Sequence, residues 1–283
     1  MKKNSVLIKF IFCLIVWPFI FIMVSIFGCR KETNTESDVS YENPFNFVGY
    51  YHNTGLDFVL QTANLKNNNL QTTSDSIIFI SKKVYDFLLT IDDRSILSPS
   101  LSNMKIESYT EKLVSGLNSK SSLYERLSDT QLHYLDKIRG TFRENSDSDS
   151  TKVFKLVAGI EKEVLKSRLN QEEKALVLVA AAVGKFSWLY WSEDKIKKNF
   201  KQDGKSINAE DWWKRLKLAV LEADIDGAIV GMIAGCIGGA IFGSVIMPGL
   251  GTISSCIAEA VNAGFYGAVI GSTLGAIKFI AAD

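Results

Sequence analysis

The stretch GAIVGMIAGCIGGAIFGSVIMPGLGTISSCIA, residues 227–258, decides the architecture of this chain, because it contains no charged side chain. Four-residue spacing puts small residues on one stripe of a helix, where a second helix approaches to backbone distance. Each interior glycine costs a helix in water about 1 kcal/mol relative to alanine, so the pattern favours a membrane-inserting helix pair. The glycines that follow this spacing are Gly227, Gly231, Gly235, Gly239 and Gly243.

A second arm follows a turn at Pro248 to Gly251. The first arm, residues 227–247, would be about 31 Å long as a helix, which matches the hydrocarbon thickness of a bilayer. We therefore predict a transmembrane hairpin over residues 224–283, with Asp224 and Asp226 at its edge. The alternative is a glycine-rich hairpin that is buried inside the protein and never inserted. The second arm repeats the small-residue stripe as Cys256, Ala260, Gly264, Gly267, Gly271 and Gly275.

Two polar residues, Glu259 and Asn262, interrupt the second arm about one turn apart on the same side. A carboxylate at membrane depth is costly, so Glu259 should face the partner helix, a water path or another copy in an oligomer. In the plainer interpretation Glu259 is protonated, binds Asn262 or Ser255, and contributes only to packing.

The N-terminus has the pattern of a secretory signal over residues 1–28, with a basic start and an apolar run. The sequence Ile26-Phe27-Gly28-Cys29 resembles a bacterial lipobox, which implies cleavage before Cys29 and lipidation of its thiol. Phe27 departs from the small residue usual at its position. Residues 29–42 are then an unstructured tether. The alternative is an uncleaved N-terminal membrane anchor; both interpretations place the rest of the chain outside the cytoplasm.

Composition excludes several functional classes. Cleavage before Cys29 would remove three lysines, leaving 29 basic and 31 acidic residues, a charge of −2 that does not suggest nucleic-acid binding. The other cysteines lie in the signal (Cys13) and in the apolar pair (Cys236 and Cys256), and the chain has two histidines. We therefore expect no metal site and no cofactor. Because the sequence has no GxSxG, HExxH or phosphate-loop motif, we do not expect an enzyme.

Residues 43–205 have the apolar periodicity of an all-α helical bundle. Residues 175–183 are apolar all round but too short to span a bilayer, which predicts the central buried helix. Residues 139–150 are interpreted as a polar linker that splits the bundle, with Gly140 as a helix stop and with Arg139 and Arg143 as candidate protease-recognition residues. Capping boxes are predicted at Ser122 with Glu125, Ser128 with Gln131, and Asn170 with Glu173.

Residues 206–223 form an amphipathic segment with Trp212 on its apolar face and Lys214, Arg215 and Lys217 opposite. Tryptophans beside basic residues are typical of a helix at a membrane interface. An ordinary bundle helix with a tryptophan core explains the pattern equally well.

The bundle opens with Asn43-Pro44-Phe45-Asn46-Phe47-Val48-Gly49, followed by His52-Asn53-Thr54-Gly55-Leu56-Asp57. This opening resembles one found in uncharacterised exported bacterial proteins, and it implies no activity. We expect His52 and Asn53 to bond backbone groups of the first helix turn rather than to bind a ligand.

In position and length the C-terminal hairpin resembles that of the pore-forming colicins, and its repeated GxxxG resembles the helix pairs of two-peptide bacteriocins. These resemblances cover only the last sixty residues. They imply a pore-forming antibacterial toxin. Together with the lipobox, we expect an envelope-localised lipoprotein, at the outer membrane or cell surface, that is released by cleavage. The expected partners are the lipid bilayer, further copies of the chain, an immunity protein and a surface receptor. The alternative is an envelope lipoprotein whose hairpin anchors it or packs against a partner, without toxicity.

Overall fold

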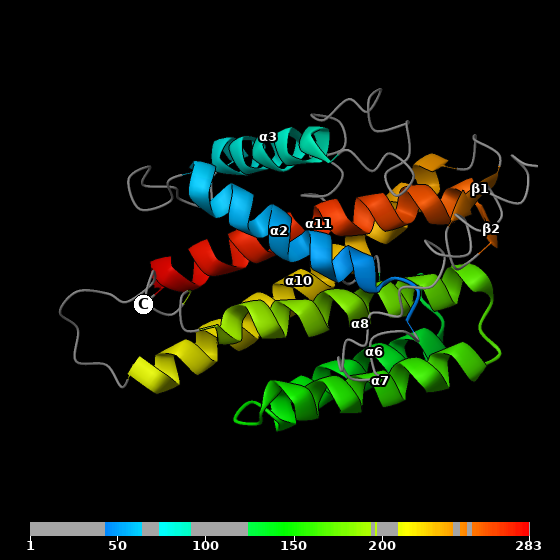
Figure 1. Cartoon of the computed structure of the whole chain (residues 1–283), viewed down its shortest axis with the longest axis horizontal. Helices are drawn as coiled ribbons and strands as arrows, with labels where there is room; N and C mark the ends of the chain where they lie inside the picture. Colours follow the sequence, from blue (N-terminus) through cyan, green and yellow to red (C-terminus); the bar gives the residue numbers. More distant parts are fainter. Residues whose placement is uncertain are drawn as a thin grey trace, which may run out of the picture. The chain divides into compact units, whose positions relative to one another are not determined.

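The computed structural model describes residues 43–63, 74–91, 124–193, 196, 209–239, 244–247 and 251–282. The predicted all-α class is confirmed (Figure 1). In chain order the elements are α2 (Asn46–Ala63), α3 (Ser74–Thr90), α6 (Asp129–Glu144), α7 (Ser150–Lys166), α8 (Gln171–Ser192), α10 (Ala209–Gly239), β1 (Ser244–Met247), β2 (Gly251–Ser254) and α11 (Ser255–Ala282). The predicted signal, Cys29 and tether lie outside the described residues.

Helix α8 lies at the centre of the bundle, as predicted, and contacts α2, α6, α7, α10 and α11. Every residue from 175 to 185 is buried, so no face of this part of the helix meets water. The helix begins at a capping box in which Asn170 and Glu173 bond each other's backbone amides, as predicted. It continues to Ser192, so it has 22 residues instead of the nine apolar ones that mark it in the sequence.

The predicted linker at residues 139–150 is wrong in its boundaries. Helix α6 begins at the predicted Ser128–Gln131 capping box and continues through Gly140 to Glu144, which leaves only residues 145–149 between α6 and α7. Gly140 does not stop the helix because the flanking turns are anchored in the core. Phe142 is fully buried, with its ring centroid 5.6 Å from that of Trp188. Such packing outweighs the cost of about 1 kcal/mol for one helical glycine.

The predicted boundary between an interfacial helix at residues 206–223 and a hairpin from 224 is also absent, since α10 is one continuous helix. Its N-terminal half packs as a bundle helix, the alternative stated above. Trp213 is buried, and its indole donates a hydrogen bond of 3.0 Å to the carbonyl of Trp191. On the same half, Lys217 lies over the ring of Trp188, 3.7 Å from its centroid.

At three glycines, helices α10 and α11 pack so closely that no side chain fits between them. A Cβ atom at Gly227 would overlap the carbonyl of Gly267, and one at Gly231 would overlap the carbonyl of Ala263. Toward the other end of the contact, a Cβ at Gly271 would overlap the carbonyl of Ala223. The four-residue glycine spacing thus places backbone against backbone over about two helical turns.

The tip of the hairpin differs from the expected pair of straight helices. Helix α10 ends at Gly239, and Ser244–Met247 forms an antiparallel ribbon with Gly251–Ser254, in which Val245 is opposite Ile253. The first arm is therefore not helical up to Met247. Val, Ile and Thr in this ribbon favour extended backbone, and the Pro248-Gly249 sequence suits the connection between the strands.

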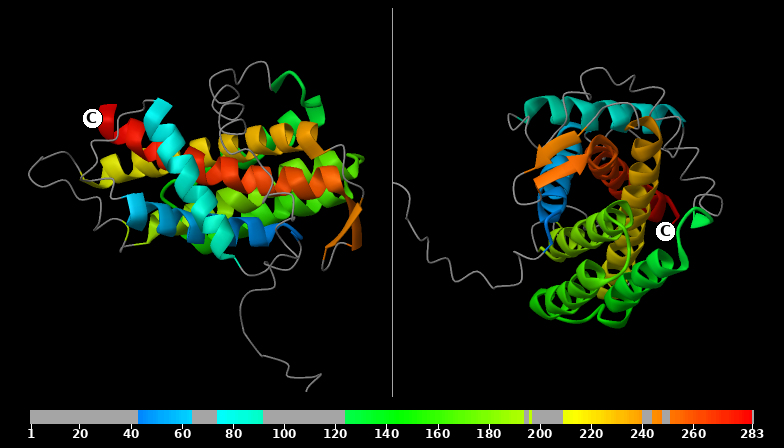
Figure 2. Two further views of the ribbon diagram at one scale, coloured as in Figure 1. Left: turned by 90° about the horizontal axis from the view of Figure 1, so that it is seen from above. Right: turned by 90° about the vertical axis from the view of Figure 1, so that its right-hand side faces the viewer.

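The hairpin is enclosed by the rest of the bundle. Helix α11 contacts α2, α3 and α8 as well as α10 (Figure 2). On its outer side the hydroxyl of Tyr266 donates to the carbonyl of Ser81 at 2.8 Å, and Phe265 packs against Phe87 of α3. The hairpin therefore has the buried arrangement stated above as the alternative to insertion.

Two helices of the described residues, Gln171–Ser192 and the segment Ala260–Ile280 within α11, are long and apolar enough to cross a membrane. Both are mostly buried inside the fold, and core helices of soluble proteins meet the same criteria. This finding is weak evidence for membrane association.

The glycine packing predicts that Gly271→Ala destabilises the fold by about 1–3 kcal/mol, because the new methyl group overlaps a backbone carbonyl that cannot move aside. The matched control is Gly159→Ala on α7, where nothing lies within 4 Å of the new Cβ. The control should stabilise the protein by about 0.5–1 kcal/mol. Chemical unfolding of the two variants measures both effects, and equal shifts would contradict the packing argument.

Candidate functional site: the C-terminal helix pair and its polar contacts

The structure brings together most of the predicted helix-packing glycines. Gly227 and Gly231 of α10 face α11, and Gly264, Gly271 and Gly275 of α11 face α10, beside Met232, Ala223 and Val220. The carbonyl of Gly267 forms part of the same contact. Gly235 is a buried residue of α10, and Gly239 is the last residue of that helix. Gly243 lies outside the described residues.

The predicted polar pair of the second arm is only partly placed. Asn262 is buried on α11, and neither atom of its side-chain amide has a hydrogen-bond partner within the described part of the chain. The side chain of Glu259 is outside what the structure describes. Whether the two residues form the predicted pair therefore stays a prediction.

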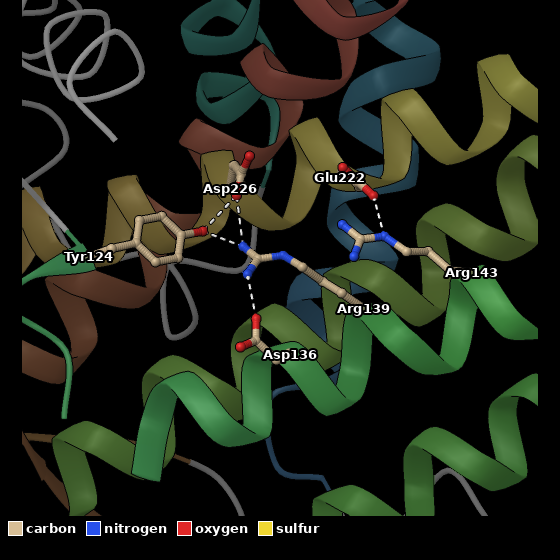
Figure 3. A network of polar contacts seen from close by, with 6 residues as sticks. All are labelled: Tyr124, Asp136, Arg139, Arg143, Glu222 and Asp226. Carbon is tan, nitrogen blue, oxygen red and sulfur yellow. Dashed lines mark hydrogen bonds and ion pairs between the residues drawn. The ribbon is translucent and has the colours of Figure 1, made fainter. Parts of the chain in front are cut away.

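Asp224 and Asp226, which were expected at the edge of a membrane segment, make buried polar contacts with other helices of the bundle. The carboxylate of Asp226 accepts hydrogen bonds from the hydroxyl of Tyr124 at 2.6 Å and from the guanidinium of Arg139 at 2.7 Å (Figure 3). Arg139 also donates to the hydroxyl of Tyr124 and lies 3.7 Å from Asp136. Burial, reinforced by Asp226, raises the pKa of the Tyr124 phenol above its ordinary value, so Tyr124 keeps its donor proton.

Arg143 makes a second contact between α6 and α10, one turn further along. Its Nε donates to the carboxylate of Glu222 at 2.7 Å, with both side chains substantially exposed. The two arginines that the sequence suggested as protease-recognition residues thus lie within a helix and bind the hairpin's first helix. Because proteases cut exposed irregular segments, the better place for a cut is the connection at residues 145–149.

Asp224 points into the protein on the side opposite Asp226. Its carboxylate accepts a hydrogen bond from the hydroxyl of Ser187 on α8 and lies 3.7 Å from the Nε2 atom of His52 on α2. Ser272 of α11 is buried in the same place. Burial raises the pKa of the Asp224 carboxyl, while the His52 imidazole and the two serines act in the opposite direction.

The placement of His52 corrects the expectation that it would bond the first helix turn. His52 is fully buried in the middle of α2, where its Nδ1 atom is 3.0 Å from the side-chain oxygen of Asn53. Asn53 does bond a backbone carbonyl, as expected, but that of Phe186 on α8 at 2.9 Å. Both residues therefore connect α2 to distant helices instead of ending a helix.

A third polar cluster joins α7, α8 and the start of α2. Lys185 and Glu161, which are both buried, form an ion pair with a distance of 2.8 Å. Lys185 also donates to Asn46 at 2.9 Å, and the side-chain amide of Asn43 donates to Glu161 at 2.5 Å and to the carbonyl of Leu178 at 2.8 Å. The Asn43-Pro44-Phe45-Asn46 opening therefore holds a buried ion pair in place.

Two of these clusters are buried within the bundle. In the Ser187, Asp224 and His52 group, both the Ser187 hydroxyl and the His52 imidazole lie against the Asp224 carboxylate. A surface pocket of about 510 Å³ opens elsewhere, near the starts of α6 and α8. Within the described ranges, no group of three or more His, Cys, Asp or Glu residues is arranged to hold a metal ion.

Comparison with protein-family models, curated proteins and solved structures finds no significant match to this chain.

Sequence reasoning missed the partners of the buried charges. A signal was present, because Lys185 and Glu161 each interrupt the apolar face of a helix. Such residues are almost never fully buried without a partner of opposite charge. The sequence could thus indicate that partners exist, but the pairing depends on how the helices pack.

The Asp226 cluster predicts that Arg139→Gln destabilises the fold by about 3–5 kcal/mol, because it leaves a mostly buried carboxylate without its counterion. The matched control is Arg143→Gln, which breaks an exposed ion pair and should cost about 0–1 kcal/mol. Urea unfolding compares the two. A small effect at Arg139 would mean that Tyr124 alone is enough to hold Asp226.

Proposed function

We propose that this chain is a membrane-inserting protein of the cell envelope that stores its C-terminal helix pair inside a helical bundle. In this proposal Cys29 carries the lipid anchor, and the stored hairpin forms pores in the manner of an antibacterial toxin. The bilayer and further copies of the chain are the direct partners. A cognate immunity protein and a surface receptor follow from the toxin activity.

The observation that carries the proposal is the length, apolar composition and glycine packing of α11. This helix is long and apolar enough to cross a membrane, and it is joined to α10 by a stripe of small residues. Stripes of small residues give helix pairs in membranes their close van der Waals contact, which lipid chains do not supply as well. The stripe continues beyond the described end of α10 into the charge-free sequence that ends at residue 258.

Insertion requires two changes to the arrangement described above. The acidic residues just before the charge-free stretch must first lose their contacts with the bundle. Glu222 and Asp226 bind α6, and Asp224 binds α2 and α8. The ribbon strand Ser244–Met247 must also become helical if residues 227–247 are to span the bilayer. The stored state is therefore held by specific polar contacts that insertion would have to overcome.

A second candidate function has its own support. Both apolar helices are mostly buried, and the glycine stripe already has its partner inside the fold. These observations favour an envelope lipoprotein in which the hairpin is a permanent part of the core and has no toxic activity. The two candidates differ in whether the helix pair ever leaves the bundle.

Leakage of dye from anionic liposomes distinguishes the two functions. We expect the purified full chain to release the dye, and Gly227→Leu and Gly271→Leu to reduce release at least tenfold, because a large side chain separates the paired helices. The matched control, Ile233→Leu, lies off the stripe on the same helix and should act like the wild type.

The result is decisive only if helicity is followed at the same time. Circular dichroism of the chain with liposomes should show a gain of helix as the ribbon converts. Binding without leakage or helix gain would favour the permanent-core function. Equal leakage from all variants would show that the glycine stripe plays no part in pore formation.

A further inference from the structure

Four helices meet at one buried polar site. Asp224 of α10, His52 of α2, Ser187 of α8 and Ser272 of α11 are all fully buried. Three polar atoms at this site have no hydrogen-bond partner within the described residues: Oδ1 of Asp224, Nε2 of His52 and Oγ of Ser272. Buried polar atoms are almost always hydrogen-bonded, so such a group calls for an explanation.

The net charge of the site depends on how many protons it holds. The Asp224 carboxyl group and the His52 imidazole lie 3.7 Å apart. The pair has no net charge when it holds one dissociable proton, whichever of the two groups carries it. Removing that proton leaves an unpaired carboxylate in the core, and adding another leaves an unpaired imidazolium. Both charged states are strongly disfavoured by complete burial. The folded protein should therefore retain the single proton over a wide pH range.

On α2, α8 and α10, the charged groups nearest in sequence to these residues have partners of their own. On α8, Lys185 binds Glu161, and on α2, Asp57 accepts from Tyr190. On α10, Glu222 and Asp226 bind Arg143 and Arg139 of α6. On α11, the described charged side chain is Lys278, which is exposed and lies near the end of the helix. The proton balance of the site thus depends on His52 and Asp224.

We propose that His52 and Asp224, with Ser187 and Ser272, form a proton-binding site that holds the C-terminal helix pair in the bundle when it is occupied. Proton uptake keeps the contact between α2 and α10 neutral. Proton loss places an unpaired negative charge between α2, α8, α10 and α11, and so favours their separation. The role of this site in controlling insertion rests on the proposed function, whereas the proton binding itself does not.

The pH dependence follows from the raised pKa of the Asp224 carboxyl. A carboxyl whose pKa is higher in the folded chain than in the unfolded chain contributes stability that is fully present below the unfolded pKa. That stability is lost as the pH rises from the unfolded pKa through the folded pKa. The helix pair is therefore held more firmly in mild acid than in mild alkali.

The test measures the unfolding equilibrium of the purified full chain between pH 5.5 and 8.5. We expect the unfolded-to-folded ratio of the wild type to rise with pH, by up to tenfold per unit for one proton. Asp224→Asn should remove this rise, because the amide keeps the shape of the site and does not titrate. An unchanged dependence in Asp224→Asn would overturn the proposal.

Two further variants separate proton binding from a merely structural role. His52→Gln removes the group that opposes the raised pKa of Asp224, so the midpoint of the pH dependence should move upward. An unmoved midpoint would contradict the assignment, even if Asp224→Asn failed to fold. Asp226→Asn is the control on the same helix. It should weaken the fold and keep the wild-type slope, because its partner Arg139 stays charged throughout this range.

Hydrogen exchange and liposome binding complete the test. After correction for the chemical exchange rate, amides of α10 and α11 should exchange faster at pH 8.5 than at pH 5.5 in the wild type, but not in Asp224→Asn. Equal protection at both pH values would overturn the proposal. A pH effect on stability in a chain that never enters liposomes would keep the proton site and reject the proposed function. Liposome entry without any pH effect on stability would keep the proposed function and reject the proton site.

Discussion

The close approach of α10 and α11 is the constraint on which the rest of the fold depends. At Gly227, Gly231 and Gly271 the backbone of one helix occupies the space where a side chain of the other would lie. Such contact fixes the rotation and register of both helices, because turning either by one residue would bring a side chain into the interface. The register in turn decides which way each acidic residue of α10 points.

That register explains why two aspartates so close in sequence have unrelated surroundings. Asp224 points toward α2, α8 and α11, where it meets His52 and Ser187, and Asp226 points toward Arg139 of α6. A helix advances about 100° per residue, so residues two apart lie on nearly opposite faces. One helix pair is thereby attached to both sides of the bundle through polar contacts. These contacts cost desolvation, and they are specific because each carboxylate needs its own partner.

The buried polar contacts of Asp224 and Asp226 also affect how firmly the helix pair is held in the bundle. A permanently buried core is served well by apolar side chains, and replacing buried ion pairs by apolar residues is often neutral or stabilising. Buried groups such as Asp224 and Asp226 make the packed arrangement sensitive to protonation or loss of a partner. The structure thus combines an apolar, glycine-rich helix pair with buried polar contacts that a change in protonation or the loss of a partner would weaken.

Local patterns in the sequence determined the helical class, the central helix, two capping boxes and the existence of a close glycine contact, because each depends on residues within a few turns. They wrongly predicted that helices end at Gly140 and near Asp224, where α6 and α10 in fact continue. There, tertiary packing of Phe142 and the partners of the acidic residues outweighed local signals of about 1 kcal/mol. The sequence also could not decide whether the hairpin is enclosed, since a buried core helix and a membrane helix have the same composition. Only the tertiary structure brings His52 to Asp224, because α2 and α10 are far apart in the chain. It also pairs Lys185 with Glu161, because that contact depends on how the neighbouring helices α7 and α8 pack.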